Sequence, residues 1–280
     1  TDYRYRETVV SKQTIAFIGA GNMARSLITG LINSGHPADR IRASDPVIAQ
    51  LEALQGTGII TAASNDQAVA DAEIVVLAVK PQVLGEVLSG LELNRAQLLI
   101  SIAAGVPLQS LEAWSSSNQP IVRCMPNTPA LVGAGISGLF ANAAVSHAQH
   151  SAAEAVLGAA GQTVWVSAEP LLDAVTAVSG SGPAYFFYLM EAMVEAGTSL
   201  GLDRDTATSL TLETAYGAAL MAKQGDQPPA QLRRNVTSPG GTTERALSIL
   251  DAADSRAVIE RALAGAAERS RELAEEFGRR

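Results

Sequence analysis

The 280-residue chain contains little cysteine, histidine or lysine. Its lone cysteine, Cys124, excludes an internal disulfide and fits a reducing cytoplasm. The three histidines, His36, His147 and His150, stand in loop-like or polar stretches without the spacing of metal ligands. We therefore expect a cytoplasmic protein without a disulfide framework and without a metal site.

Long apolar runs and an excess of basic residues are also missing. No apolar run reaches the ~20 residues that span a bilayer, and residues 1–12 are polar and lack the apolar core of a signal peptide. The net charge of −8 argues against nucleic acid or an anionic membrane as a partner. The hydrophobic content of 47% provides for a sizeable core, and the length suggests one large or two ordinary domains.

The segment Thr14–Ala24 reads T-I-A-F-I-G-A-G-N-M-A, and the rest of the chain is organised around it. A short apolar run predicts a strand buried on both faces, and apolar residues at helical spacing follow the glycines. Strand, G-x-G-x-x-A turn and helix are the context of the dinucleotide fingerprint. Gly19 permits the turn, Gly21 lets the backbone approach a pyrophosphate, and the helix N-terminus attracts phosphate. The alternative, a strand–turn–helix without a ligand, is less favoured by the flanking pattern.

Further apolar runs alternate with helical segments over the first 166 residues or so, which predicts a doubly wound parallel sheet of the Rossmann type. The expected strands lie near 41–44, 59–60, 73–79, 98–102, 121–125, 136–140 and 163–166. Ligands of such sheets bind beyond the carboxyl ends of the strands. The loops after residues 18, 44, 79, 102 and 125 should therefore share one edge.

Asp45 ends the second expected strand. Its separation from Gly19 is close to that of the acidic residue that accepts hydrogen bonds from an adenosine ribose. Asp-Pro is also common in turns at strand ends. Both interpretations of Asp45 are open at this point.

No convincing strand pattern follows Glu169-Pro170. Residues 184–200 predict a helix that is apolar nearly all round, which must be buried in a bundle or between subunits. Asp203 or Thr206 can cap the next helix, and further helices are expected near 229–235, 242–252 and 254–277. We expect a dinucleotide-binding domain over 13–168 and an all-helical domain over 169–280 that forms a tight homodimer.

A second loop rich in glycine and hydroxyl groups, Asn235–Thr243, precedes a predicted helix. Its turn Ser238–Gly241 offers N–H groups to a small carboxylate, and Thr242 and Thr243 add hydroxyls. A helix-capping loop is the alternative interpretation.

The scarcity of bases bears on the chemistry. Alcohol oxidation needs a base near the cofactor, and residues 184–200 contain neither lysine nor histidine. Hydride delivery to an already polarised C=N bond does not need such a base, because a hydrogen-bonding hydroxyl and correct positioning can suffice.

Six motifs together resemble pyrroline-5-carboxylate reductase in order and spacing. They are G-A-G-N-M-A, A-V-K-P (78–81), S-I-A-A-G-V (101–106), R-C-M-P-N-T-P (123–129), S-G-S-G-P-A-Y (179–185) and N-V-T-S-P-G-G-T-T (235–243). The resemblance covers residues 14–273. It implies reduction of 1-pyrroline-5-carboxylate to L-proline with NAD(P)H, an N-terminal Rossmann domain, a helical dimerisation domain, and dimers that often assemble into decamers.

The resemblance also implies residue roles. Thr243 would be the catalytic residue, since it would hydrogen-bond the ring nitrogen and hold it for hydride delivery. Asp226 stands where many family members have Glu, so a charge role there is open. The implied substrate contacts are Asp226, Asn235, Ser238, Gly240, Gly241, Thr242 and Thr243. The implied cofactor contacts are Ile18, Gly19, Ala20, Gly21, Asn22, Met23, Ser44, Asp45, Asn65, Ala78, Val79, Lys80, Pro81, Ile102, Ala103, Ala104 and Asn127.

The choice of cofactor depends on Asp45. Several family members have Ser there, which suits a 2′-phosphate, whereas a carboxylate favours a 2′-OH. We expect a preference for NADH, although Arg42 is near enough in sequence to offset the repulsion. The alternatives are a 2-hydroxyacid-type dehydrogenase, a related imine reductase, or a silent nucleotide-binding dimerisation module. The module would have no need for Thr242-Thr243.

Overall fold

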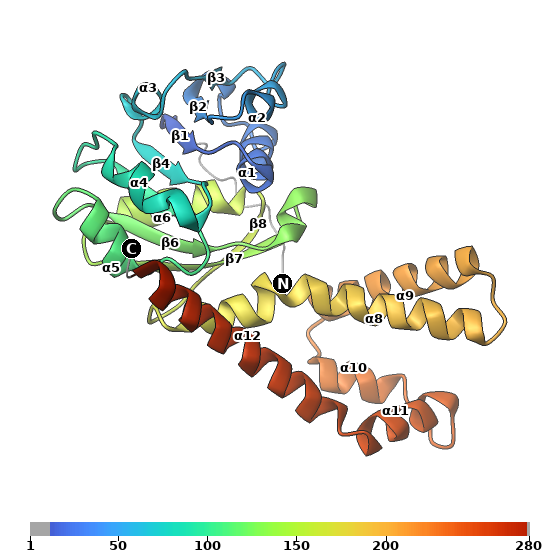
Figure 1. Ribbon diagram of the computed structural model, residues 1–280. Helices are drawn as coiled ribbons and strands as arrows, with labels where there is room; N and C mark the ends of the chain where they lie inside the picture. Colours follow the sequence, from blue (N-terminus) through green and yellow to red (C-terminus); the bar gives the residue numbers. More distant parts are fainter. Residues whose placement is uncertain (1–11, 279–280) are drawn as a thin grey trace. The chain divides into compact units, whose positions relative to one another are not determined.

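The computed structural model describes residues 12–278. The expectation of no signal core therefore concerns residues that lie, apart from Lys12, outside the described chain. The described chain forms two compact units, one that runs to Ser181 and resumes at Ala266, and one over Gly182–Gly265 (Figure 1). The domain boundaries 13–168 and 169–280 stay predictions.

Within residues 12–278, an eight-stranded sheet has the order β3-β2-β1-β4-β5-β6-β7-β8. The strands are β1 (Ile15–Ile18), β2 (Ile41–Ser44), β3 (Ile60–Thr61), β4 (Ile74–Leu77), β5 (Leu98–Ser101), β6 (Ile121–Met125), β7 (Gly135–Ala141) and β8 (Gly161–Trp165). All neighbours from β3 to β6 pair in parallel, as the alternating pattern predicts. Every residue of β1, β4 and β5 is buried, which explains their continuous apolar sequences.

One strand pair departs from the expected parallel arrangement. β6 and β7 are antiparallel, with Cys124 opposite Leu139. Residues 126–134, which include the 3-10 turn η2 (Thr128–Val132), form a connection shorter than the dozen or so residues of a parallel crossover. β8 is parallel to β7, and α6 (His147–Gly158) provides the longer connection there.

Helices pack on both faces of the sheet, so the sheet is doubly wound. Ile15 and Phe17 point into an apolar cluster with α1 (Asn22–Asn33) and α6, whereas Ala16 and Ile18 point into a second cluster. The second cluster includes residues of α3 (Asn65–Val69), α4 (Pro81–Ser89), α5 (Leu108–Trp114) and the end of α12 (Ser255–Gly278). Shorter elements complete this unit: η1 (Ala38–Arg40), α2 (Ile48–Glu52), α7 (Leu171–Val175) and the π-helical turn η3 (Thr176–Gly180).

Every element assigned within Gly182–Gly265 is a helix, as expected. They are α8 (Gly182–Ser199), α9 (Arg204–Gln224), α10 (Pro229–Asn235), α11 (Thr242–Ala252) and the first part of α12. Asp203 caps α9 by accepting the Thr206 N–H at 2.9 Å. The described helices include none long and apolar enough to cross a membrane.

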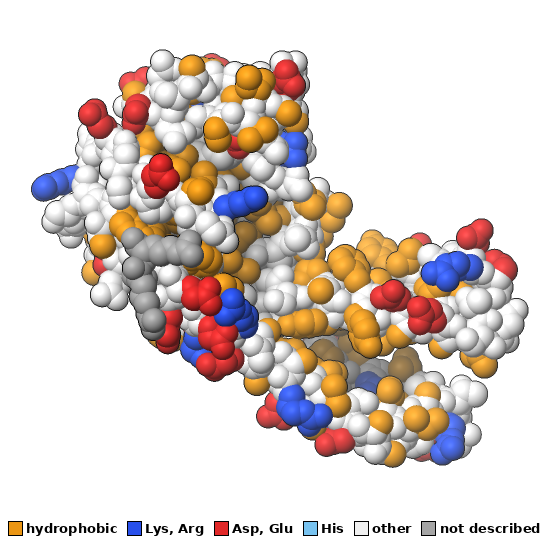
Figure 2. Space-filling view, in the orientation of Figure 1, with side chains coloured by type: hydrophobic (Ala, Val, Ile, Leu, Met, Phe, Trp, Pro, Cys, Tyr) orange, Lys and Arg blue, Asp and Glu red, His pale blue; other side chains and the backbone are white. Residues whose placement is uncertain are grey.

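Several large apolar side chains of α8 are exposed in the single chain, whereas Val194 is buried. Phe186 is 65% exposed and Tyr188 is 75% exposed, and Figure 2 shows apolar side chains on the helical region of the face in view. The sequence predicts that this helix is buried either in a bundle or between subunits. Burial inside the single chain is excluded for Phe186 and Tyr188.

Candidate functional site

The predicted common edge of loops is present. The register sets Ile18 beside Ser44 and Leu77, and Leu77 beside Ser101. The strands from β2 to β6 are parallel, so their following loops leave the same edge. The strand order reverses between β1 and β4, which is the switch point where ligands of open α/β sheets bind.

The glycine turn after β1 has the geometry of a phosphate cradle. Gly19 has φ +97°, and a Cβ there would lie 2.7 Å from the Ala78 carbonyl oxygen. Gly21 is the N-cap residue of α1 and makes no side-chain cap, and a Cβ there would meet no described atom within 4 Å. The first turn of α1 therefore has free N–H groups beside open space, which fits the pyrophosphate of a dinucleotide.

Ser44, Asp45 and Asn65 come together with the glycine turn. The Ser44 hydroxyl donates to Asn65 Oδ1 at 2.7 Å, and Asp45 Oδ2 accepts the Ala20 N–H at 2.8 Å. Asp45 Oδ1 also accepts the Val47 N–H at 2.8 Å. This confirms the turn role of Asp45 at the strand end and adds a tie to the glycine loop that the sequence did not reveal.

Arg42 is directed elsewhere. Arg42 lies two residues before the end of β2, and its Nη2 is 3.2 Å from Asp71 Oδ2. Its charge is therefore partly neutralised by Asp71, and Asp45 is the charged side chain at the end of this strand.

Two further predicted segments meet beside the glycine turn. The Ala78 N–H donates to the Ile18 carbonyl at 2.8 Å, and the Ile102 N–H donates to the Leu77 carbonyl at 3.2 Å. Lys80 is exposed as the N-cap residue of α4. The loops after β1, β4 and β5 are thus adjacent, in the arrangement expected for a nicotinamide-side wall.

Both polar atoms of the Asn127 side chain form hydrogen bonds within the chain. Its Nδ2 donates to the Ser179 carbonyl at 3.2 Å, and its Oδ1 accepts the Ile136 N–H at 2.9 Å. The side chain ties the turn η3 to β7, and Met125 packs beneath Gly180. The contact of Asn127 with a nicotinamide stays a prediction.

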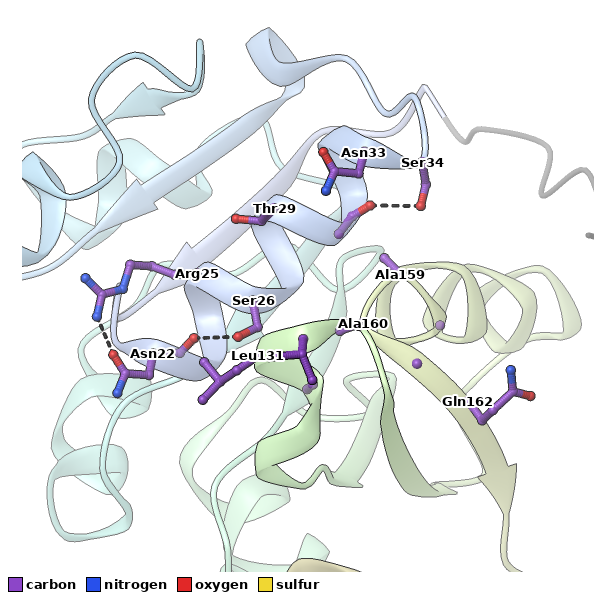
Figure 3. A pocket seen from close by; sticks show the side chains of 16 residues that line it. Asn22, Arg25, Ser26, Thr29, Asn33, Ser34, Leu131, Ala159, Ala160 and Gln162 are labelled. Carbon is purple, nitrogen blue, oxygen red and sulfur yellow. Dashed lines mark hydrogen bonds between the residues drawn. The ribbon is translucent and has the colours of Figure 1, made fainter. Parts of the chain in front are cut away.

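A groove of about 1100 Å³ runs along α1 next to η2, and Figure 3 shows its lining. Of the predicted site residues, the described lining includes only Asn22. Asn22 accepts a hydrogen bond from the guanidinium of Arg25. Arg25 is a residue of this lining that the sequence analysis did not single out. A cation is unfavourable in the first turn of a helix unless an anion is near, so its position in α1 was the available signal.

The predicted substrate loop lies in the second unit, and some of its donors are already used. The Gly241 N–H donates to the Ser238 carbonyl at 3.0 Å, and the Gly240 N–H donates to Glu244 Oε2 at 2.7 Å. These two N–H groups are therefore not free, contrary to expectation. The hydroxyls of Ser238, Thr242 and Thr243 have no hydrogen-bond partner within residues 12–278, and they remain available to a ligand.

Two other predicted substrate contacts have different surroundings. The side-chain amide of Asn235 bonds Gln227 and Gln231, each at 2.7 Å, so it braces α10. Asp226 is exposed in the connection between α9 and α10. No described hydrogen bond connects the side chain of Asp226 to the loop 235–243.

Neither the cysteine nor the acidic and histidine side chains of the described chain form a second reactive site. Burial raises the pKa of the Cys124 thiol to about 12, so the thiol is protonated at neutral pH and is no candidate nucleophile. Residues 12–278 include no cluster of three or more histidine, cysteine or acidic side chains that could hold a metal ion.

The fold and the glycine cradle together define a class of protein. A sheet with this strand order and switch-point turn, followed by a helical unit, is the architecture of a nicotinamide-dinucleotide oxidoreductase.

Comparison with known proteins narrows this class. The family described as "NADP oxidoreductase coenzyme F420-dependent" matches residues 14–105, and "Pyrroline-5-carboxylate reductase dimerisation" matches residues 169–273. The pyrroline-5-carboxylate reductase of Pseudomonas aeruginosa is 55% identical over 96% of this chain and 100% of its own. This chain belongs to the pyrroline-5-carboxylate reductase family and is an NAD(P)H-dependent oxidoreductase.

Two solved structures agree. The enzyme of Coxiella burnetii is 42% identical, with a TM-score of 0.90 over 94% of this chain and 99% of that one. The enzyme of Plasmodium falciparum, with NADP bound, is 31% identical, with a TM-score of 0.83 over 94% of this chain and 98% of that one.

Proposed function

We propose that this chain reduces 1-pyrroline-5-carboxylate to L-proline with NAD(P)H, the last step of proline biosynthesis. The observation that carries the proposal is the start of α11, where Ser238, Thr242 and Thr243 offer hydroxyls without an intramolecular partner in the described chain. A dehydrogenase of 2-hydroxy acids needs a base near the cofactor, usually His, Lys or Tyr, and α8 has no Lys or His, although it contains Tyr185 and Tyr188.

The residues divide the work by chemistry. The bound dinucleotide supplies the hydride. Ile18 to Met23 would hold its pyrophosphate, and the segments 78–81 and 102–104 would line its nicotinamide half. The hydroxyls of Ser238 and Thr242, with the N–H groups of the first turn of α11, hold the substrate carboxylate. The Thr243 hydroxyl would hydrogen-bond the ring nitrogen and hold it for hydride delivery.

The test is oxidation of NADH and NADPH in the presence of 1-pyrroline-5-carboxylate, followed by the absorbance of the reduced cofactor. A control reaction combines NAD+ or NADP+ with 2-hydroxy acids. We expect turnover with the imine. Turnover with the hydroxy acids alone, or with neither, would contradict the proposal.

We propose further that NADH is the preferred cofactor. The support is the Asp45 carboxylate at the adenosine end of the edge, with Arg42 paired to Asp71 instead. The NADP-bound Plasmodium falciparum relative is the observation against it.

The Asp45→Asn variant tests this preference, because it removes the charge and keeps an oxygen for the Ala20 N–H, although the Val47 N–H loses its acceptor. We expect kcat/KM for NADH to exceed that for NADPH in wild type. The variant should shift the ratio towards NADPH by about ten-fold, which corresponds to 1.4 kcal/mol. A strong NADPH preference in the wild-type enzyme would contradict the proposal.

Glu244 gives a second prediction about this site. Its carboxylate on the Gly240 N–H brings a negative charge to the loop where the substrate carboxylate binds. Glu244→Gln removes that charge and keeps an acceptor, so we expect KM for 1-pyrroline-5-carboxylate to fall by about two- to five-fold, with kcat unchanged. Glu260→Gln on α12 is the control for a general change in net charge. An unchanged or higher KM in Glu244→Gln would show that Glu244 only caps α11.

We propose that the helical unit forms a homodimer through the exposed apolar side chains of α8. The family matched by residues 169–273 supports this assignment. Assembly of dimers into a decamer, and a cytoplasmic location, are further parts of the proposal.

A further inference from the structure

The last part of α12 packs on the loop that follows β5. A Cβ placed on Gly105 would lie 3.1 Å from Leu273 Cβ and 3.4 Å from Phe277 Cδ2, and Gly105 has φ +74°. Phe277 is only 7% exposed and belongs to the apolar cluster under α4 and α5. Glycine is therefore needed at position 105 both for its conformation and for the close approach of α12.

A buried polar contact fixes this helix in place. The Ser270 hydroxyl donates to Asp173 Oδ1 at 2.7 Å, and Ser270 is 4% exposed. This partly buried hydrogen bond is directional, so it ties α12 to α7 at a defined position along the helix. The side chains one and two turns further on, Leu273 and Phe277, are thereby aimed at Gly105.

The other end of the same loop is held by an ion pair. Glu169 Oε1 accepts the Leu108 N–H at 2.7 Å and also lies 2.7 Å from Arg123 Nη1. The Arg123 side chain is 9% exposed. The segment 102–108 is therefore clamped by Glu169 where α5 begins and by α12 at Gly105.

Phe277 also borders a hollow beside the start of α4. Together with Pro81 and Trp114 it lines a hollow of about 390 Å³ between α4 and α5. Pro81 is the first residue of α4 and directly follows the segment 78–80. The end of α12 therefore packs on the loop at Gly105 and also borders the hollow beside the start of α4.

We propose that Leu273 and Phe277 are positioning residues for the cofactor: from beneath the loop they fix segment 102–105 in the conformation that receives the nicotinamide. This inference rests on the proposed function. It predicts that loosening the end of α12 weakens cofactor binding although no residue of α12 is among the assigned cofactor contacts.

The test uses the full chain with the variants Phe277→Ala, Leu273→Ala and Phe277→Leu. Glu272→Ala, at an exposed position of the same helix, is the matched control. Dissociation constants for NADH and NADPH are measured by fluorescence titration without substrate, and hydrogen exchange is followed at the amides of residues 98–108. Size-exclusion chromatography establishes that each variant keeps the wild-type oligomeric state.

We expect Phe277→Ala and Leu273→Ala to raise the dissociation constant by about three- to ten-fold, the range of remote positioning contacts. Exchange at residues 102–106 should become faster, and Phe277→Leu should restore most of the affinity. Glu272→Ala should match wild type.

If Phe277→Ala or Leu273→Ala folds and binds both cofactors with wild-type affinity, the inference is overturned, even if the melting temperature of that variant is lower. If Phe277→Ala does not fold, the half-buried Leu273→Ala decides the question in the same way. Failure of the wild-type chain itself to bind either dinucleotide would instead contradict the proposed function.

Discussion

Replacement of Thr243 by valine is expected to lower kcat for 1-pyrroline-5-carboxylate reduction by about 10²- to 10³-fold, the usual effect of removing one preorganised donor at a reacting centre. Valine has nearly the same shape as threonine but has no hydroxyl to hold the ring nitrogen. The Thr243 hydroxyl makes no hydrogen bond to any described residue, so the folded chain loses little. NAD(P)H affinity should stay at its wild-type value, and steady-state kinetics with a separate cofactor titration measure both quantities.

Thr237→Val is the matched control, since Thr237 lies in the same loop and its hydroxyl already donates to the Arg233 carbonyl at 2.6 Å. We expect this variant to keep kcat within about two-fold of wild type, with a small loss of stability of about 1 kcal/mol. An unchanged kcat in Thr243→Val would remove Thr243 from the mechanism. Equal losses in both variants would assign the effect to the loop as a whole.

Alanine at the two glycines of the turn should separate folding from binding. In Gly19→Ala the new methyl group would lie 2.7 Å from the Ala78 carbonyl oxygen, at φ +97°. We expect a loss of stability of about 3 kcal/mol or more together with loss of cofactor binding. In Gly21→Ala the methyl group meets no described atom, so the fold should keep its stability, while affinity for NAD(P)H falls by about 10²-fold because the pyrophosphate loses its close approach to the backbone.

Thermal unfolding and cofactor titration of both variants provide the measurement. Tight NAD(P)H binding by Gly21→Ala would place the pyrophosphate away from this turn. A normal melting temperature for Gly19→Ala would show that the contact with Ala78 relaxes without cost.

The sequence predicts the sheet well because local pattern determines it. The apolar runs of β1, β4 and β5 are buried on both faces, and the glycines after Ile18 specify a turn that few other residues allow. The same reasoning places five loops on one edge, since parallel strands end together. The antiparallel β7 could have been anticipated from the short connection after Met125, which leaves no room for a crossover.

Other features depend on contacts between distant residues, which no local pattern records. The tie from Asp45 to Ala20 and the pairing of Arg42 with Asp71 require the folded strand order. Phe186 on α8 is 65% exposed in the single chain, although the apolar sequence of its helix predicts burial. The seat of Phe277 at Gly105 joins positions far apart in the chain, and helical periodicity in α12 gives no indication of it.

The contact between Phe277 and Gly105 has a consequence for synthesis on the ribosome. The strands of the sheet are complete once Trp165 has emerged, and they can pair early because most of their contacts are sequential. The apolar cluster around Val106 and Leu84 nevertheless stays open on one side until Phe277 has been made. A nascent chain therefore has a nearly finished sheet with an uncovered apolar surface for the whole time that the helical unit is being translated, and this long-range contact can form only after the end of α12 has been made.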